Sequence, residues 1–405
     1  MQPNHPDASQ TRHNPPQPFR ALFPVFFYFL AAGIATVMLG PLLPALIQRW
    51  HIQDAQAGTL FTASFAGQFC GAWFATRNLR ASILYGSAIT AVGCVGMALA
   101  SFSQAHIALF CIGLGLGAGL TAGNVIAGTA VPAARARLIA LLNVAWGLGA
   151  IACPLLVRLL STDSTVGTQR FFFTIAIFLA ITSLVSIAIP HFTQAADPTE
   201  AFSQATSQAV SAQPRFPLSP LPLFVFGAAT FLYIGVENSL GGWLPSYAVR
   251  TNPSLHASSI SISFWIAELT GRILVTALMT LIGEAALYRI CLALLILTQV
   301  LLCATTNISA NGIVTLTVLA ALSLAPLYPL IMSFLLARTG NHARLGALFA
   351  TASFGGATLP WLTGVFSTQF HGLRAGLLVP AAGAALLLFL SAIITTKPAQ
   401  AAKVQ

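Results

Sequence analysis

The chain has 405 residues, of which 57% are hydrophobic and only 6% are charged, and its formal net charge at pH 7 is +10. A soluble domain carries roughly a quarter charged residues, so this chain cannot cover itself with groups that suit water. Its basic residues are scattered singly between long apolar runs and form no patch of the kind that nucleic acids need. Composition therefore indicates a protein solvated by a lipid bilayer and argues against nucleic acid as a partner.

Two polar stretches divide the chain. Residues 1–18 are proline-rich and lack the apolar core of a signal peptide, so we expect a disordered cytoplasmic tail followed by an apolar run that acts as the insertion signal. Residues 193–219 are rich in Ala, Ser, Gln and Thr and are expected to be a cytoplasmic linker. The predicted domains are then six-helix bundles over 19–192 and 220–396, with a second cytoplasmic tail over 397–405.

Twelve apolar runs follow one another along the chain, each near the roughly 20 residues that a helix needs to cross a bilayer. They predict an all-α membrane protein with twelve transmembrane helices in two six-helix halves. In the first half the predicted spans are 24–48, 58–76, 81–101, 106–130, 138–160 and 171–191. In the second half they are 221–249, 258–281, 287–306, 313–337, 345–368 and 373–396.

The placement of Lys and Arg predicts the orientation of these spans, because cytoplasmic loops carry an excess of both. With both termini in the cytoplasm, the inner side holds about twice as many basic residues as the outer side. The inner ones are Arg12, Arg20, Arg77, Arg80, Arg135, Arg137, Arg215, Arg289, Arg338, Arg344, Lys397 and Lys403. The outer ones are Arg49, Arg158, Arg170, Arg250 and Arg374. We expect a multi-pass protein of the inner (cytoplasmic) membrane.

The two halves repeat a pattern of small and aromatic residues at an offset close to 200. The matches are Phe29-Leu30-x-x-Gly33 with Phe231-Leu232-x-x-Gly235, Gly40 with Gly242, Gln68-x-x-Gly71 with Glu268-x-x-Gly271, and Gly149 with Gly356. They occur in the same order in both halves. Parallel halves of six spans are the plan of a secondary transporter, whose substrate site lies near the bilayer midplane.

Three charged residues lie deep inside predicted spans, all in the second half: Glu237, Glu268 and Arg272. Such residues are costly in a bilayer and tend to be functional or paired. Glu268 and Arg272 are four residues apart on one helix face, which fits either a structural ion pair or a glutamate that exchanges a proton during transport. Glu237 has no cation at helical spacing, so we expect it to be protonated or to find a partner on another helix. It is the better candidate for handling a proton, although it could instead lock its helix by hydrogen bonds.

Amides and aromatic rings inside the predicted spans suit a neutral polar ligand such as a sugar. Amides bond hydroxyls, and flat apolar faces stack on pyranose rings. Two other interpretations stay open: Trp243 as a residue of the interfacial aromatic belt, and any single Asn as a contact between helices. The candidate substrate-binding residues are Gln68, Asn124, Asn143, Trp146, Tyr233, Asn238, Trp243, Tyr328 and Trp361.

The fourth predicted span carries glycine at every second position from Gly113 to Gly119. No strand precedes this run and no Lys-Ser/Thr follows it, so it predicts close helix packing rather than a nucleotide-binding loop. Pro245, Pro326 and Pro360 mark places where helices could bend. The six cysteines lie in apolar runs without C-x-x-C spacing, so neither a metal nor a cofactor is expected.

These motifs resemble the major facilitator superfamily, and within it the branch that contains fucose:proton symporters and sodium–glucose carriers. The stretch from Phe231 to Glu237 is similar to the Y-x-G-x-E signature of that branch in helix seven, and Gly242-Trp243-Leu244-Pro245-x-Tyr247 is similar to the residues that follow it. The pattern Asn124 through Pro132, Leu142-Asn143, Gly147-x-Gly149 and Pro154 resembles its helix four to five region. The resemblance implies a twelve-helix carrier in which Asn143 contacts a sugar.

The sequence departs from that branch at acidic positions. Leu120 stands where the branch has an acidic residue four positions before the Asn124 equivalent, and the first span has no acid. Ala75 replaces the aspartate of the superfamily's loop motif after the second span. Ion coupling is therefore expected in the second half, which holds Glu237 and Glu268.

The leading hypothesis is alternating-access transport of a small polar solute, a sugar or related organic compound, coupled to a proton or a sodium ion. The alternatives are efflux of drugs or amphipathic metabolites, and a carrier-fold protein that senses or scaffolds without transporting. The spans contain no nucleophile–His–acid set, so an enzyme is not expected. We expect a monomer whose partners are a small-molecule substrate and the lipid bilayer, with no cofactor.

Overall fold

The computed structural model describes residues 18–75, 78–130, 134–160, 164–187, 189, 220–339 and 345–395. Within these ranges the chain forms helices joined by short turns and contains no strand, so the all-α prediction is confirmed. The helices of the first half are α1 (Pro18–Val37), α2 (Leu39–Trp50), α3 (Asp54–Phe74), α4 (Leu79–Leu99), α5 (Phe102–Ala130), α6 (Arg135–Leu159) and α7 (Thr165–Ser186). Those of the second half are α9 (Pro220–Thr251), α10 (Ala257–Leu281), α11 (Glu284–Ala304), α12 (Ala310–Leu324), α13 (Leu327–Thr339), α14 (Leu345–Gln369), α15 (Leu373–Gly376) and α16 (Leu378–Ile394).

Polar residues in the turns begin several of these helices by accepting hydrogen bonds from backbone N–H groups that have no partner within the helix. The side chains of Asn78, Ser164 and Ser309 cap α4, α7 and α12 in this way. Gln53 and Gln56 form a reciprocal capping box at the start of α3. These caps fix where the apolar helices begin.

Each of the twelve predicted spans overlaps a helix or a pair of helices within the described residues. The first span consists of α1 and α2, which meet at Met38 with a bend of 41°. The tenth consists of α12 and α13, which are separated at Pro326, where a break was predicted. In contrast, α9 and α14 continue through Pro245 and Pro360. The bend at Met38 was not predicted.

By length and composition alone, eight of the described helices could cross a membrane, or nine spans if the bent pair α1 and α2 counts as one. Three helices that coincide with predicted spans, α3, α9 and α14, are not among them. Helix α14 packs on both of the others, so these three lie against one another rather than only against lipid. They also carry polar residues such as Gln68 and Glu237, which lower their hydropathy.

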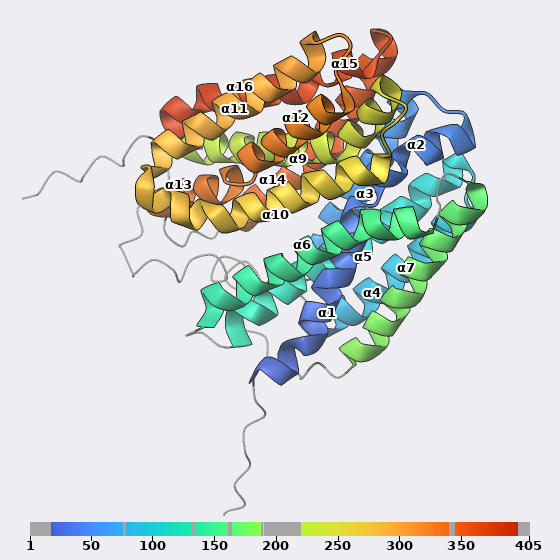
Figure 1. Cartoon of the computed structure of the whole chain (residues 1–405). Helices are drawn as coiled ribbons and strands as arrows, with labels where there is room; N and C mark the ends of the chain where they lie inside the picture. The colour runs from blue at the N-terminus through green and yellow to red at the C-terminus, as the bar shows by residue number, and fades with distance from the viewer. Residues whose placement is uncertain are drawn as a thin grey trace, which may run out of the picture.

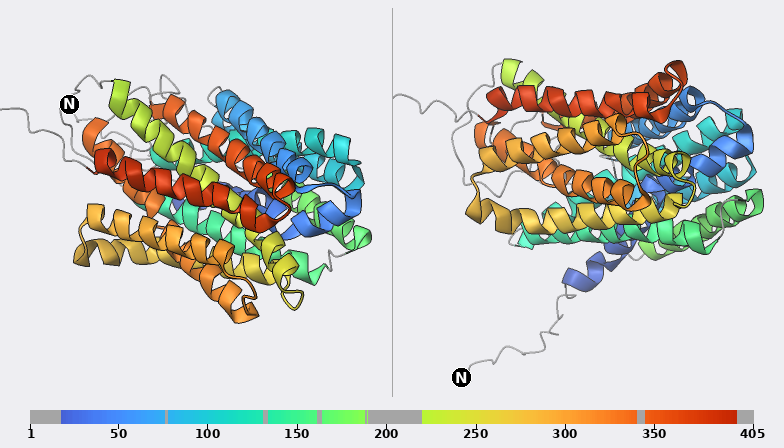
Figure 2. Two further views of the ribbon diagram at one scale, coloured as in Figure 1. Left: turned by 90° about the horizontal axis from the view of Figure 1, so that it is seen from above. Right: turned by 45° about the horizontal axis from the view of Figure 1, so that its top comes forward.

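The helices gather in two groups that lie side by side, α1–α7 and α9–α16, in all the views of Figures 1 and 2. In the first group α3 and α4 pack on α5, and α1 packs on α6. In the second group α9 packs on α14 and α16, and α12 packs on α10 and α11. The predicted linker 193–219 and residues 1–17 and 396–405 lie outside the described residues, so the predicted domain boundaries stay predictions.

Glycines bring the first and fifth spans of each half into backbone contact. A Cβ on Gly149 would collide with the carbonyl oxygen of Leu30, where α6 crosses α1. In the second half a Cβ on Gly355 would collide with the carbonyl oxygen of Phe231, where α14 crosses α9. The sequence repeat pairs Gly149 with Gly356, which is one residue from Gly355. The two crossings are therefore equivalent to within one residue, which supports two related halves.

The glycine run of the fourth predicted span packs α5 against α3. A Cβ on Gly113 would collide with the Ser64 carbonyl oxygen, and one on Gly117 with the Gln68 carbonyl oxygen. The prediction of close helix packing at this run is therefore confirmed.

The two halves are in contact at the end of the molecule where α3 begins, called the Asp54 end below. Further from that end, α2 crosses α9 at Gly40, where a Cβ would collide with the Gly241 carbonyl oxygen. Helix α14 likewise crosses α3 at Gly364, where a Cβ would collide with the carbonyl oxygen of Asp54. The backbones of the two halves are therefore in direct contact at these two crossings.

Candidate functional site

The three predicted intramembrane ionisable residues form one cluster between α9 and α10, called the Glu–Arg–Glu cluster. Arg272 Nη2 lies 2.8 Å from Oε1 of Glu237 and 2.5 Å from Oε1 of Glu268. The hydroxyl of Tyr233 donates to the same Glu237 oxygen over 2.7 Å. Glu237 and Glu268 are 8% and 2% exposed. Of the two expectations for Glu237, the structure supports a partner on another helix, because packing α9 on α10 brings Arg272 to it.

Aromatic rings from both halves surround this cluster. The guanidinium carbon of Arg272 lies 5.7 Å from the ring centroid of Trp146 on α6, within the range of a cation–π interaction. Trp146 in turn meets Trp265 of α10 edge to face, with ring centroids 5.7 Å apart. On α13, Tyr328 lies 5.4 Å from Tyr233 between ring centroids. Trp146 therefore links the first half to the charged cluster of the second.

The cluster holds two carboxylates against one guanidinium, so it carries one unbalanced negative charge when both carboxylates are ionised. A net charge buried in a membrane protein is costly. One bound proton, or another cation, would remove the imbalance. The arrangement is therefore suited to taking up a proton and to releasing it when the position of Arg272 changes. Among the described residues no three His, Cys, Asp or Glu side chains gather as a metal site would require.

A small cavity of about 20 Å³ lies between the halves, next to the cluster along α9 and α10. Its polar lining comes from four helices and consists of Thr36, Ser64, Asn238 and Trp265, and Phe61 contributes an apolar wall. Asn238 was predicted as a substrate-binding residue; its Nδ2 donates to the Ile234 carbonyl oxygen over 2.8 Å. The sequence analysis did not single out Trp265, because a lone tryptophan in an apolar run carries no pattern of its own.

The other predicted substrate-binding residues are more dispersed. Trp243 is fully buried and donates its indole N–H to the Pro360 carbonyl oxygen over 2.9 Å, so it joins α9 to α14. The alternative that Trp243 belongs to an exposed aromatic belt is therefore wrong. Asn124 and Asn143 each donate their amide N–H to the backbone of their own helix, over 3.0 Å in both cases.

Gln68 and Trp361 complete the predicted set. Gln68 is partly buried where α3 meets α5, and Trp361 is 39% exposed on α14. The structure thus brings Trp146, Tyr233 and Tyr328 to the charged cluster and Asn238 to the cavity. It does not gather the remaining predicted residues in that cavity.

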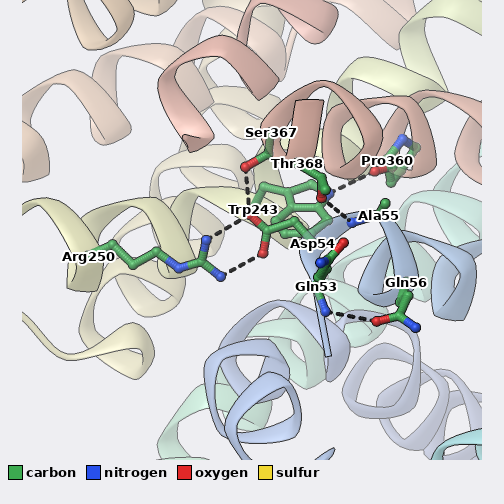
Figure 3. A network of polar contacts seen from close by, with 9 residues as sticks. All are labelled: Gln53, Asp54, Ala55, Gln56, Trp243, Arg250, Pro360, Ser367 and Thr368. Atoms are coloured by element: carbon green, nitrogen blue, oxygen red, sulfur yellow. Dashed lines mark hydrogen bonds and ion pairs between the residues drawn. The ribbon is translucent and has the colours of Figure 1, made fainter. Parts of the chain in front are cut away.

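A second polar network lies at the Asp54 end and is drawn in Figure 3. Arg250 of α9 binds both carboxylate oxygens of Asp54 over 2.7 Å each, and Asp54 is only 8% exposed. Ser367 of α14 donates to Asp54 Oδ2 over 2.5 Å, and the backbone N–H of Ala55 donates to the Thr368 hydroxyl over 2.9 Å. We call these contacts the Asp54 latch. It ties the first turn of α3 to two helices of the other half.

The sequence analysis did not find this latch. Asp54 precedes the predicted span 58–76, and Arg250 was assigned to the outer surface, so neither was considered as a partner. The two residues are 196 positions apart, and no local spacing pairs them. The available signal was the scarcity of acidic residues, since the chain holds eight Asp and Glu in all.

The latch borders a cavity of about 950 Å³ that Tyr247, His371 and Arg374 also line.

Comparisons with known proteins agree with this architecture. Residues 25–349 match the model of the Major Facilitator Superfamily. Bypass of stop codon protein 6 of Saccharomyces cerevisiae is 25% identical over 273 residues, which are 60% of this chain and 54% of that protein, so the chain spans about half of its length. The glucose/mannose transporter GlcP of Bacillus subtilis is 26% identical over 358 residues, covering 84% of this chain and 86% of that protein.

Among solved structures, that of the E. coli fucose:proton symporter FucP superposes with a TM-score of 0.61 at 17% identity, over 94% of this chain and 99% of that one. At this identity the superposition reports the fold alone. The family model covers most of the chain, and the sequence-based resemblance to this superfamily is confirmed. The chain belongs to the Major Facilitator Superfamily and is a multi-pass membrane transporter, not an enzyme.

Proposed function

We propose that this transporter moves a neutral sugar or a related polyhydroxy compound by secondary active, alternating-access transport. The observation that carries the proposal is the small polar cavity between the halves, which lies beside aromatic rings and the Glu–Arg–Glu cluster. Amide, hydroxyl and indole groups bond sugar hydroxyls, and aromatic faces stack on sugar rings. Similarity to the glucose/mannose transporter GlcP supports the same substrate class.

A proton is the coupling ion in this proposal, and Glu237 or Glu268 binds it. The two carboxylates compete for one guanidinium, so a proton on either one balances the cluster. Arg272 also faces Trp146 of the first half, so a movement between the halves changes what surrounds the guanidinium. This contact gives a physical route by which opening and closing of the halves alters proton binding.

The proposed orientation places both termini in the cytoplasm of the cell and the Asp54 end outside, at the inner membrane. It follows the excess of basic residues at the opposite end of the helices. The Asp54 latch then closes the outer side of the pathway, and it must open before a solute can enter from outside. The transporter acts as a monomer, since each six-helix half already has its partner in the same chain.

Uptake by proteoliposomes tests the proposal. The purified full-length chain is reconstituted and offered labelled D-glucose, D-mannose and L-fucose, with an inward proton gradient, an inward sodium gradient or neither. We expect accumulation of at least one sugar with the proton gradient, up to about tenfold per pH unit for one proton per sugar. Accumulation with sodium alone would identify sodium as the coupling ion instead. Absence of sugar uptake together with export of an amphipathic dye would replace the proposal by efflux.

A further inference from the structure

The indole N–H of Trp265 is buried without a hydrogen-bond acceptor among the described residues. Trp265 is 5% exposed, and it lines the small cavity between the halves. Buried polar groups in proteins are nearly always paired, so an unpaired donor beside a cavity requires an explanation. The indole nitrogen can only donate, and a packed indole cannot turn to a carbonyl of its own helix as a serine hydroxyl can.

Packing holds this indole in place. Phe264 and Trp146 both meet the Trp265 ring edge to face, with centroids 5.0 and 5.7 Å away. The absence of a side chain on Gly241 makes room for the ring, since a Cβ there would lie 3.1 Å from Trp265 Cζ2. Contacts on several sides restrict the ring to one orientation, so the donor is preorganised for whatever enters the cavity.

The rest of the cavity lining completes a site for hydroxyl groups. The amide of Asn238 uses its N–H on its own helix, which leaves its oxygen as an acceptor. Thr36 donates its hydroxyl to Ala32, so its oxygen lone pairs can accept. Ser64 adds a second hydroxyl, and none of the described residues that line the cavity has a charged side chain. One fixed donor with neighbouring acceptors matches a hydroxyl group, which both accepts and donates.

We propose that the Trp265 indole N–H donates to one hydroxyl oxygen of the transported sugar and is a specificity-determining contact of the site. This inference rests on the proposed function and deepens it, because it assigns the discrimination between sugars to a single donor. A site built to bond a hydroxyl rejects an analogue that lacks it, because the donor is then left unpaired. In the present arrangement the cavity of about 20 Å³ has room for one such group, and a water molecule is the competing occupant.

Binding of D-glucose, D-mannose and their singly deoxygenated analogues to the purified full-length chain tests this inference. For the wild type we expect one deoxy position to weaken binding by about tenfold, the loss of one buried hydrogen bond. Trp265→Phe should weaken binding of the parent sugar to a similar extent. This variant should bind that same deoxy analogue as tightly as it binds the parent sugar. Trp50→Phe is the matched control: it removes an indole N–H that bonds the Ala100 carbonyl oxygen at the Asp54 end, and it should bind all sugars as the wild type does.

The outcomes separate the two proposals. If the wild type binds none of these sugars, the proposed substrate class fails, and the inference fails with it. If Trp265→Phe binds the sugars as tightly as the wild type does, the N–H bonds only a buried water. The same conclusion follows if the variant loses as much affinity as the wild type for every deoxy analogue. A second measurement does not need the variant to fold. Of the six indole N–H signals of ¹⁵N-tryptophan-labelled protein, that of Trp265 should shift with the parent sugar and not with the critical deoxy analogue.

Discussion

Charge balance at the Glu–Arg–Glu cluster is the residue-level feature on which the proposed proton coupling depends. With two carboxylates the cluster needs one proton for neutrality, and with a single carboxylate it needs none. We predict that Glu237→Gln and Glu268→Gln each abolish sugar accumulation driven by a proton gradient, because Arg272 then has one permanent partner. Exchange of labelled for unlabelled sugar should persist, since exchange needs no net proton movement.

Glu284→Gln supplies a matched control for these variants. Glu284 begins α11 and accepts from the Ser333 hydroxyl over 2.9 Å, away from the cluster, so its loss should leave accumulation intact. Counterflow and gradient-driven uptake are measured on the same vesicles. Gradient-driven accumulation that survives both cluster substitutions would make Glu237 and Glu268 structural residues that only hold α9 against α10.

These residues show how much of the site could be predicted from the sequence. A charged residue inside a long apolar run is visible in the sequence itself. Glu237, Glu268 and Arg272 could therefore be predicted as candidate functional residues. The triple contact itself is tertiary, since Glu237 and Arg272 are 35 positions apart on different helices. Asp54 and Trp265 were missed because burial and an unpaired indole N–H are properties of packing, which single residues in a sequence do not reveal.

At the scale of helices, the glycine crossings define how closely the first and fifth spans of each half approach. We predict that Gly149→Ala destabilises the protein by about 1–3 kcal/mol, because the added methyl group would collide with the Leu30 carbonyl oxygen and force α6 away from α1. Gly355→Ala should behave similarly at the equivalent crossing of α14 and α9. Thermal unfolding of the purified protein in detergent measures both changes.

Gly283→Ala is the control for these helix variants. A Cβ at Gly283 would meet nothing within 4 Å, so the same chemical change should leave the unfolding temperature nearly unchanged. Equal behaviour of all three variants would mean that the crossings tolerate separation and that the repeated glycines do not set the helix spacing.

Helix positions were the most predictable part of the fold, because an apolar run of the right length has few alternatives in a membrane protein. Helix interruptions were less predictable. Proline removes a backbone donor and crowds the carbonyl group four residues before it, yet α9 and α14 accommodate Pro245 and Pro360. The bend between α1 and α2 falls at Val37 and Met38, directly where Pro41 removes the hydrogen bond to the Val37 carbonyl group. The signal for that bend was therefore present in the sequence, but a proline alone does not show whether its helix will break or continue, as Pro245 and Pro360 illustrate.

For the whole molecule, the two halves are alike in helix order and unlike in charge. The Glu–Arg–Glu cluster belongs to the second half, and the first half contributes Trp146 to it and Asp54 to the latch. Both contacts cross between the halves, so both change when the halves move relative to each other. In the proposed mechanism the cluster connects that movement to a proton, and the latch determines how readily the Asp54 end opens.

The latch therefore sets the balance between the form closed at the Asp54 end and the open form. We predict that Asp54→Asn or Arg250→Gln shifts this equilibrium about fivefold towards opening, because a partly exposed ion pair contributes about 1 kcal/mol. Spin labels at Ser103 and Thr306, exposed residues at this end of the two halves, report the opening as a population with a longer distance between the labels.

The double variant should open no further than either single variant, since both substitutions remove the same ion pair. Arg158→Gln removes an exposed charge outside the latch and should leave the distances unchanged. If it opens the Asp54 end equally, net charge rather than the pair controls the equilibrium.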